Sequence, residues 1–426
     1  MAQKLKFGNG TWATKEGSTL AYNDENEKYK PLPFSFERDS IGTRVNKEGL
    51  IEIVGKDIPR IDYTDSTEGV LLLENSSTNL ITYSEDFSQG VWNKTNCTII
   101  SNNSISPNGT QNADKLVENN IINGFSNRYS TSVSYTSGAK YTTSIFAKSD
   151  GRDLMIRSYN GSSDIDTIFD LSNGIVLLGN GEIKDYGNGW YRCSHTITAQ
   201  STINTSFSAS FVLVNNSSIS YQGDGTSGIY IWGAMVEQGS YPTSYIPTNG
   251  STVQRAAETC NESGNSEVFN DSQGVLFVDS ATLVEGEDVR IIGLSDGGTN
   301  NRISITYHST ENRIQIYGSK NGTIFNLEYL NAIKTDYNKI AIKYNASSVD
   351  FYYNGFLVDT EVPSDMFDAN ILNSLNFDRI DNNNNFYGKT KEIGYYDEIL
   401  TDAELETLTS YRSLSELVTE LNLNTL

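Results

Sequence analysis

The sequence predicts an all-β protein with two tandem antiparallel β-sandwiches of the jelly-roll type. Its hydrophobic content is low, at 37%, while Tyr, Asn, Ser, Thr and Gly are abundant, which favours strands and turns over helices. Short runs of alternating apolar and polar residues recur between turn residues, as is typical of sandwiches. The length of 426 residues allows two or three domains, each with its own core.

The first sandwich is expected over residues 80–248. Alternating runs at 140–149 and 206–214 and a hairpin at 169–179 supply strands. The most apolar run covers 228–237 and has the pattern of a strand in the middle of a sheet, buried on both faces. Strict alternation would divide its side chains into Ile229, Ile231, Gly233 and Met235 on one face and Tyr230, Trp232, Ala234 and Val236 on the other.

The second sandwich is expected over residues 271–412, where two hairpins give the strongest signals. One pairs Ile303, Ile305 and Tyr307 with Ile314 and Ile316. The other turns at Asn354-Gly355, a dipeptide that favours a type I′ turn. Its register would pair Tyr353 with Phe356, Phe351 with Val358 and Asp350 with Asp359. The last pair joins like charges, so it needs solvent, a lysine or a cation beside it.

Helix is expected only at the C-terminus, including a helical tail over 413–426. Thr401 with Glu404, and Ser413 with Glu416, have the spacing of capping boxes. An apolar stripe follows helical spacing and favours packing on the second sandwich over a subunit contact; it consists of Leu405, Leu408, Leu414, Leu417, Val418 and Leu421.

Residues 1–79 contain short extended pieces in turn-rich polar sequence and no pattern long enough for a core. We expect an N-terminal arm that packs on another surface. Residues 249–270 are expected to form a linker between the two sandwiches.

Charge and cysteine content exclude several classes of protein. The formal net charge of −22 is spread along the chain without a Lys/Arg cluster, so nucleic acid is not expected as a partner. Cys97, Cys193 and Cys260 are an odd number without a close pair, which fits reduced thiols better than disulfides or a zinc site. The sequence offers no signal-peptide core and no membrane-length apolar run, so neither secretion by a signal peptide nor membrane insertion is expected.

Several stretches resemble the fibre, tail and head-attached proteins of tailed bacteriophages. They are "FSFERDSIGTRVNKEGLIE" (34–52), "IPRIDYTD" (58–65), "LLLENSSTNLITYSEDFSQGVWNK" (71–94), "GNGWYRCSHTITA" (187–199) and "GIYIWGAMVEQGSYPTSYIPT" (228–248). Residues 4–34 are similar to the N-terminal segment of such fibres in crAss-like phages. The resemblance implies a carbohydrate-binding-module-like sandwich over 80–248 and a virion-attachment arm over 1–79.

The C-terminal half is similar to concanavalin A-like, laminin-G-type lectin sandwiches. The similarity is carried by the hairpin "DFYYNGFLVD" (350–359) and by "KEIGYYDEILTDAELETL" (391–408), a last strand followed by a short capped helix. Since fold does not determine function, the residues of the site must be argued separately.

The sequence offers little for catalysis. His195 and His308 both lie in alternating strand runs, and His195 shares its expected core face with Cys193. Concanavalin A-like folds include retaining glycosidases with two carboxylates about 5–5.5 Å apart, but their E-x-D-x-x-E pattern does not occur here. The nearest acidic cluster, Glu285, Glu287 and Asp288, is predicted to be a solvated turn. We therefore expect no enzyme.

The sequence contains more residues suited to glycan binding than to catalysis. Sugars are bound by aromatic faces together with amide and carboxylate groups. The candidate glycan-binding residues in turn-rich positions are Trp92, Tyr129, Tyr159, Tyr221, Tyr387, Asn382 and Asn383. Trp190 and Trp232 are predicted to be packing residues. No cofactor is expected beyond a structural Ca²⁺, for which Asp86, Asp224 and Glu237 are weak candidate ligands.

The resemblance to phage proteins implies a structural protein of a phage virion, assembled in the host bacterial cytoplasm. Residues 1–79 would contact other virion proteins, and a homotrimer would bind host-surface or mucus glycan. The alternative is a purely architectural decoration or collar protein. A capsule depolymerase is the less favoured third hypothesis.

Overall fold

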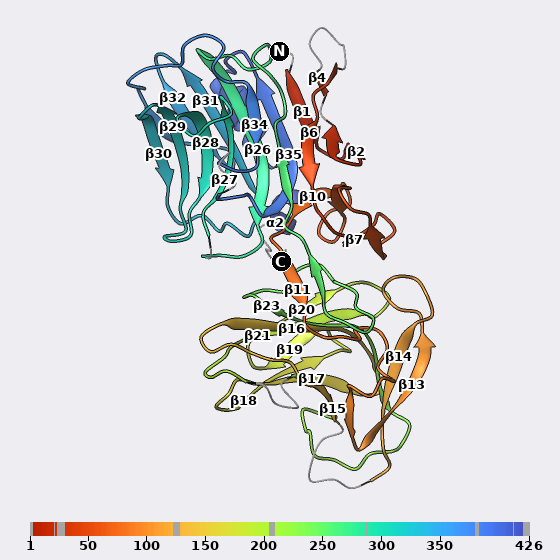
Figure 1. Cartoon of the computed structure of the whole chain (residues 1–426). Coiled ribbons are helices and arrows are strands. Elements are labelled where there is room, and N and C mark those ends of the chain that lie inside the picture. The colour runs from red at the N-terminus through yellow and green to blue at the C-terminus, as the bar shows by residue number, and fades with distance from the viewer. Residues whose placement is uncertain are drawn as a thin grey trace. The chain divides into compact units, whose positions relative to one another are not determined.

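The chain forms two compact units, each assembled from separate parts of the sequence (Figure 1). The structure is a computed structural model that describes residues 3–20, 22–23, 30–121, 128–203, 209–286, 288–379, 383–411 and 413–420. Unit 1 consists of Met1–Ile41, Val54–Asn75 and Ala257–Leu426, and unit 2 of Gly42–Ile53 and Ser76–Ala256. Within the described residues the secondary structure is strands and two short C-terminal helices, which confirms the all-β prediction.

Unit 1 is a sandwich of a ten-stranded and a five-stranded sheet, counted over the described residues. The larger sheet has the order β33-β32-β31-β26-β35-β1-β4-β5, and β10 pairs with both β35 and β9. Its strands are β33 (Phe356–Glu361), β32 (Val349–Tyr353), β31 (Asn338–Asn345), β26 (Gln273–Thr282), β35 (Gly388–Tyr396), β1 (Leu5–Gly8), β4 (Tyr22–Asn23), β5 (Lys30–Pro31), β10 (Val70–Leu73) and β9 (Arg60–Asp62).

The smaller sheet of unit 1 has the order β30-β29-β28-β27-β34. Its strands are β30 (Thr323–Tyr329), β29 (Ile314–Lys320), β28 (Asn301–Tyr307), β27 (Arg290–Ser295) and β34 (Ser374–Asn376). Ile305 pairs with Ile316 and Tyr307 with Ile314, as the sequence predicts. A further small sheet contains β2 (Ala13–Lys15), β3 (Ser18–Leu20), β6 (Phe34–Glu37) and β25 (Thr259–Asn261).

The N-terminal residues are part of this sandwich, which corrects the prediction of a separate arm over 1–79. In Figure 1, the red β1 and the orange β10 lie beside the blue β35. Leu5 pairs with Tyr395, and Leu71 with Thr390, so β1 and β10 follow one another along a single edge of β35. Phe7, Phe34 and Leu71 are buried in the unit 1 core. The short N-terminal segments, which have no core of their own, therefore complete a core formed mostly by residues far away in the sequence.

The prediction of a linker over 249–270 is also wrong, because residues in this range form strands that pair within the two units. It contains β24 (Val253–Arg255), which pairs with β11 (Ser77–Asn79) in unit 2, and β25, which pairs with β6 in unit 1. Its Glu258 side chain is buried and bonded to Arg38 and Arg60. Extended, polar sequence here forms paired strands rather than a free connection.

Unit 2 is a sandwich of two six-stranded sheets, again counted over the described residues. The first sheet, in spatial order, contains β12 (Asn93–Thr95), β15 (Arg128–Thr131), β22 (Ala209–Val214), β17 (Asp153–Tyr159), β18 (Asp164–Asp170) and β19 (Ile175–Leu178). The second contains β13 (Cys97–Ser104), β14 (Ala113–Glu118), β23 (Gly228–Gln238), β16 (Lys140–Asp150), β21 (Tyr191–Thr198) and β20 (Gly181–Asp185). A hairpin of β7 (Gly42–Val45) and β8 (Ile51–Val54) covers Trp190 and Trp232, which pack as predicted.

The strand β23 lies between β14 and β16, in the middle of its sheet as predicted, but its side chains do not alternate strictly. Gly233 and Ala234 together oppose Ile145, which makes a β-bulge, and Gly233 has a φ of 64°. The bulge moves Ala234 and Val236 to the face of Ile229 and Ile231, inside the main core. The predicted division of residues 228–237 into two faces therefore holds only up to Trp232.

The hairpin β32–β33 turns at Asn354-Gly355, and both residues have positive φ, as a type I′ turn requires. Tyr353 pairs with Phe356 as predicted. Val358 is an extra residue on β33, so Phe351 pairs with Asp359 and Asp350 with Thr360, and the two other predicted pairs are wrong. Asp350 instead forms an ion pair of 2.7 Å with Lys343.

The C-terminal helices are α1 (Asp402–Thr409) and α2 (Leu414–Glu420). Thr401 and Glu404 form the predicted capping box, and the Ser413 hydroxyl accepts a hydrogen bond from the Glu416 N–H at 3.0 Å. Leu405 is buried on the larger sheet of unit 1, with Leu408 partly buried beside it. Leu421 lies outside the described residues. No helix of the described chain has the length and apolar character to cross a membrane.

Candidate functional site

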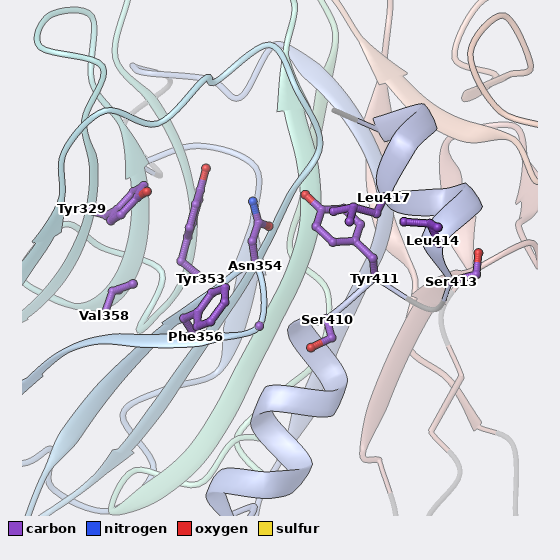
Figure 2. Close-up of a pocket in the computed structure, with 11 residues that line it drawn as sticks. Tyr329, Tyr353, Asn354, Phe356, Val358, Ser410, Tyr411, Ser413, Leu414 and Leu417 are labelled. Atoms are coloured by element: carbon purple, nitrogen blue, oxygen red, sulfur yellow. The ribbon is translucent and has the colours of Figure 1, made fainter. Parts of the chain in front are cut away.

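A groove in unit 1 lies between the tip of the β32–β33 hairpin and the two C-terminal helices (Figure 2). We call it the aromatic groove. Its volume is about 760 Å³, and it is lined by Tyr329, Tyr353, Asn354, Gly355, Phe356, Val358, Ser410, Tyr411, Ser413, Leu414 and Leu417. Figure 2 shows the rings of Tyr329, Tyr353 and Phe356 on one side and Tyr411, Leu414 and Leu417 on the other.

The turn at Asn354-Gly355 positions one wall of the groove. The Asn354 side-chain oxygen accepts a hydrogen bond from the Lys339 N–H at 2.9 Å, and the Gly355 N–H donates to the Thr409 hydroxyl at 3.2 Å. A Cβ on Gly355, which has a φ of 90°, would lie 2.7 Å from the Ser410 Oγ. Glycine therefore allows both the turn and the close approach of the hairpin to the end of α1.

Two tyrosines form the floor of the aromatic wall. The rings of Tyr329 and Tyr353 are stacked, with centroids 4.2 Å apart and an interplanar angle of 30°. The Tyr353 hydroxyl donates a hydrogen bond to the Asn338 side-chain oxygen. Burial raises the pKa of Tyr353, so this hydroxyl is neutral at physiological pH. The pair is rigid and uncharged.

Exposed apolar side chains flank this stacked pair. Phe356 is 72% exposed on β33, and Leu414 is 71% exposed at the start of α2. Leu417, one turn further along α2, is half-buried. An exposed ring beside a rigid aromatic pair is a surface on which a ligand can stack.

The described side chains that line the aromatic groove are aromatic, aliphatic or neutral and polar. None of them is charged. Its polar groups are the Asn354 amide, the hydroxyls of Ser410 and Ser413, and the tyrosine hydroxyls. These groups can exchange hydrogen bonds with ligand hydroxyls while the rings contact apolar faces.

The sequence-predicted aromatic residues of the first sandwich are not brought together in a site. Trp92 is a core residue, 3% exposed, against Phe87 and Phe211, and its indole N–H donates to the Tyr83 carbonyl. The prediction for Trp92 is therefore wrong, because a turn-rich sequence here folds over the core. Tyr159 packs partly into the same core.

The other two first-sandwich candidates are Tyr221 and Tyr129. The guanidinium of Arg152 lies over the Tyr221 ring, 5.2 Å from its centroid, so this ring face is already covered. The backbone of Tyr129 lies in β15, opposite Phe211, while its side chain is outside the described part of the chain.

The second-sandwich candidates lie around β27 and the loop before β35. Tyr387 is buried, with the Arg290 guanidinium 4.8 Å from its ring centroid and its hydroxyl accepting from the Asn385 amide. It is a packing residue, which corrects its prediction as a ligand contact. Asn383 is exposed, and Asn382 lies outside the described residues. None of these three lines the aromatic groove as described.

The weak calcium candidates do not form one site. Asp86 accepts hydrogen bonds from Ser88 and Gln89. A hydrogen bond from the Ser227 hydroxyl holds the pKa of Asp224 well below its usual range. Burial raises the pKa of Glu237, which accepts from Ser77 and Thr243. The described residues contain no group of three acidic, His or Cys side chains arranged to hold a metal.

The histidines have structural surroundings, as predicted for His195. Its ring is 2% exposed, with Nε2 2.8 Å from the Ser158 hydroxyl and Nδ1 3.2 Å from the Thr167 hydroxyl. His308 lies 2.8 Å from the Gln315 side-chain oxygen. The three cysteine side chains are all buried.

A polar pocket of about 610 Å³ contains a pair of carboxylates that the sequence did not suggest. Asp279 on β26 pairs directly with Glu392 on β35, so both side chains project from neighbouring strands. Lys339 is buried beside them and forms ion pairs with Asp279 at 2.9 Å and Glu416 at 3.1 Å. Lys6 lies 4.0 Å from the Glu392 carboxylate, so each member of the carboxylate pair has an ammonium partner, as in an ion-pair network.

The acidic turn near residue 285 is also an ion-pair region. Glu285 accepts hydrogen bonds from the backbone of Lys334 and Thr335 and pairs with the Lys334 ammonium at 3.2 Å. Asp288 pairs with Arg290 at 3.3 Å. Glu287 lies outside the described residues.

Sequence reasoning found the hairpin and both helices but missed the groove that they form. The residues that it missed are Tyr329, Tyr353, Phe356, Val358, Tyr411, Leu414 and Leu417. One signal was present in the sequence: the hairpin tip "YYNGF" places aromatic residues on both sides of a turn, where they are seldom fully buried.

Comparisons with known proteins show only distant likeness. No protein-family model and no curated protein matches the chain. The CBM40 module of the Ruminococcus gnavus IT-sialidase bound to α2,3-sialyllactose has 14% identity and a TM-score of 0.30, covering 35% of this chain and 94% of that one. Domains LG4-5 of the mouse laminin α1 chain have 10% identity and a TM-score of 0.24, covering 69% and 91%. At these TM-scores neither likeness supports an inference about function.

Proposed function

We propose that this chain is a glycan-binding surface protein of a bacteriophage virion, which attaches the particle to host-surface or mucus glycan. The aromatic groove carries the binding part of this proposal. It combines the exposed Phe356 ring, a rigid stacked tyrosine pair and the Asn354 amide in one concave surface. The virion part rests on the resemblance of residues 34–94 and 187–248 to phage fibre and tail proteins.

The physical basis of binding is stacking with hydrogen bonds at the rim. The C–H face of a pyranose ring packs on an aromatic face, and the hydroxyls at its edge bond to amide and hydroxyl groups. Such single contacts are weak, so a virion protein gains from several copies that bind one polysaccharide together. A homotrimer would supply that multivalency, and sedimentation of the purified full chain tests it.

The experiment for the glycan-binding site uses Phe356→Ala on the full chain, with binding measured on a glycan array and confirmed by calorimetry. Phe356 is mostly exposed, so its truncation should leave the fold intact. We expect about tenfold or greater loss of affinity for the glycan that the unmodified chain binds. The matched control is Leu357→Ala, on the same strand, 48% exposed and not among the groove residues. Equal effects of the two substitutions would contradict the assignment.

Virion attachment needs a test that leaves the fold intact, since residues 1–79 supply core side chains. Ile53 is 62% exposed within that range, and Ile100 is 47% exposed outside it. We expect Ile53→Glu to prevent incorporation into particles and Ile100→Glu to permit it, with immunodetection on purified virions as the measurement. Normal incorporation of the Ile53→Glu chain would argue against attachment through this surface.

The architectural alternative is favoured by one observation. The edge strand β19 exposes Ile175, Leu177 and Leu178, a set of side chains suited to contact with another protein. A correctly assembled chain that binds no glycan on the array would favour this alternative.

Hydrolysis is tested at the carboxylate pair of Asp279 and Glu392. We expect no release of reducing ends from host polysaccharide by the purified chain, because both carboxylates are engaged in ion pairs, Asp279 with Lys339 and Glu392 with Lys6. Release that disappears with Glu392→Gln would establish a depolymerase instead.

A further inference from the structure

We infer that the aromatic groove selects an uncharged sugar that carries a methyl group, namely a 6-deoxyhexose or an N-acetylhexosamine. This inference deepens the proposed function and rests on it. It follows from three features of the described groove residues: their lack of charge, an aliphatic wall, and one amide with hydrogen-bond donors to spare.

Acidic sugars have no cationic partner among the described groove residues. Carboxylate and sulfate groups are bound in proteins by Arg or Lys, and the described residues that line the groove include neither. The chain also has a formal net charge of −22, which repels anions at longer range. A uronic acid or a sulfated sugar would thus lose hydration of its charge without compensation.

The aliphatic wall favours a methyl group over a hydroxyl. Leu414 and Leu417 of α2 face the groove with no polar atom in their side chains, and Leu414 is 71% exposed. A sugar hydroxyl against this wall would have no hydrogen-bond partner there. A methyl group in the same place would gain affinity of about fourfold to tenfold from burial.

The Asn354 amide would orient the ligand in the groove. Its Oδ1 is already committed to the Lys339 N–H, whereas its Nδ2 donates to no described residue. Among the described residues no acceptor engages the N–H groups of this amide, which can donate to a ring hydroxyl or to the carbonyl of an N-acetyl group. Ser410 donates its hydroxyl proton to the Glu406 carbonyl, which leaves its oxygen as an acceptor. A ligand with one acceptor near the rings and one methyl near α2 matches this distribution.

The experiment compares matched methyl glycosides by saturation-transfer NMR and by titration of the full chain. L-fucose is compared with L-galactose, and N-acetylglucosamine with glucose, so that each pair differs at the methyl-bearing group. We expect one pair to show a preference of about fourfold to tenfold for the methyl-bearing sugar, with strongest saturation at its methyl protons. A preference for L-fucose over L-galactose would identify a 6-deoxyhexose as the ligand. A preference for N-acetylglucosamine over glucose would identify an N-acetylhexosamine.

The variant for this test is Leu414→Asn, which keeps much of the side-chain volume but places an amide in the aliphatic wall. It should reduce the methyl preference while stacking on Phe356 persists. Leu357→Asn is the control, since Leu357 is 48% exposed and not among the groove residues. Thermal melting of both variants verifies that each is folded.

The outcomes separate this inference from the proposed function. Equal affinity within both sugar pairs, or tighter binding of glucuronic acid than of glucose, would overturn the methyl inference while glycan binding stands. Absence of binding to every sugar on the array and in titration would overturn both.

Discussion

His195 shows how a single buried residue links the structure of unit 2 to pH. Its imidazole contacts the hydroxyls of Ser158 and Thr167 and has almost no access to water. Burial lowers the pKa of His195 to about 4, against an ordinary value of 6.5. His195 therefore binds a proton less readily in the folded chain than in the unfolded chain.

This difference predicts how stability depends on pH. Above pH 6.5 the histidine is neutral in both states and contributes nothing to the pH dependence. As pH falls from 6.5 to about 4, only the unfolded state binds the proton, so stability declines, by about 3 kcal/mol in all. His195→Asn should remove this part of the slope. Urea unfolding followed by tryptophan fluorescence measures it, because Trp92, Trp190 and Trp232 all belong to unit 2. An unchanged slope in the variant would contradict the prediction.

At the residue scale, the sequence predicted the roles of residues in strands better than the roles of residues in turns. His195, Trp190 and Trp232 were correctly predicted to be packing residues, because each lies in an alternating strand pattern. Trp92 and Tyr387 were wrongly predicted to contact a glycan, because turn composition says nothing about whether a turn folds over a core. The groove residues were missed because Tyr329, Phe356 and Leu414 meet only through tertiary contacts.

Among the elements, β6, β9, β10 and the chain before β25 are joined by a buried ion network. The Glu258 carboxylate accepts hydrogen bonds from Arg38 at 2.7 Å and from the Arg60 Nε at 2.8 Å, and Arg60 also pairs with Glu74 at 2.8 Å. All four side chains are almost completely buried. Each element supplies one charge, so the network fixes their arrangement within unit 1.

Removal of one partner should be costly because it leaves the others charged and buried. Glu258→Gln is expected to lower the free energy of unfolding by about 3–5 kcal/mol. The exposed pair of Lys56 and Asp39 gives a matched control, and Asp39→Asn should cause no measurable change, because solvent screens that pair. Denaturant titration of the full chain measures both. A cost for Glu258→Gln as small as that of the control would show that water enters the network.

The role of β10 is tested in the same way. Leu71 is fully buried in the unit 1 core, so Leu71→Ala should lower the free energy of unfolding by about 2–5 kcal/mol. Ile53 also lies within residues 1–79 but is largely exposed, and Ile53→Ala should change the free energy by less than about 0.5 kcal/mol. Melting of the two variants gives the comparison. A separate arm, as the sequence predicted, would give two equally small effects.

At the element scale, local rules worked where pairing is local. The Asn354-Gly355 turn, the β28–β29 register and the α1 capping box all follow from residues close in sequence. The bulges at Gly233 and Val358 were missed because strict alternation was assumed along both strands, although Gly233, with a φ of 64°, is a residue type that often marks a bulge. A single extra residue then reverses the faces beyond it.

At the scale of the whole molecule, the prediction of two sandwiches was correct. The prediction of which sequence segments form each sandwich was wrong. The chain passes between the units at four points, after Ile41, Ile53, Asn75 and Ala256. The pairing of β1 and β10 with β35 spans most of the chain, and no periodicity within a short window can indicate such a partner. Domain boundaries drawn from composition alone thus separated strands that share one sheet.

The charge of the whole molecule gives a last prediction, which separates binding in the groove from association by charge. The chain carries a formal charge of −22, while the described groove residues carry none. Between about 0.01 M and about 1 M salt the Debye length shortens from about 30 Å to about 3 Å, so charge-dependent association changes strongly over this range. Affinity for a neutral sugar should change by less than about twofold, because no ion pair forms or breaks.

The measurement is a calorimetric titration of the full chain with the best neutral methyl glycoside at both salt concentrations. Retention on an anionic polysaccharide column provides the contrast, since screening of the −22 charge should increase retention as salt rises. A neutral-sugar affinity that fell steeply with salt would mean that a charged group outside the described groove residues contacts the ligand. Binding would then depend on the surrounding surface, and the uncharged groove could not account for selection by itself.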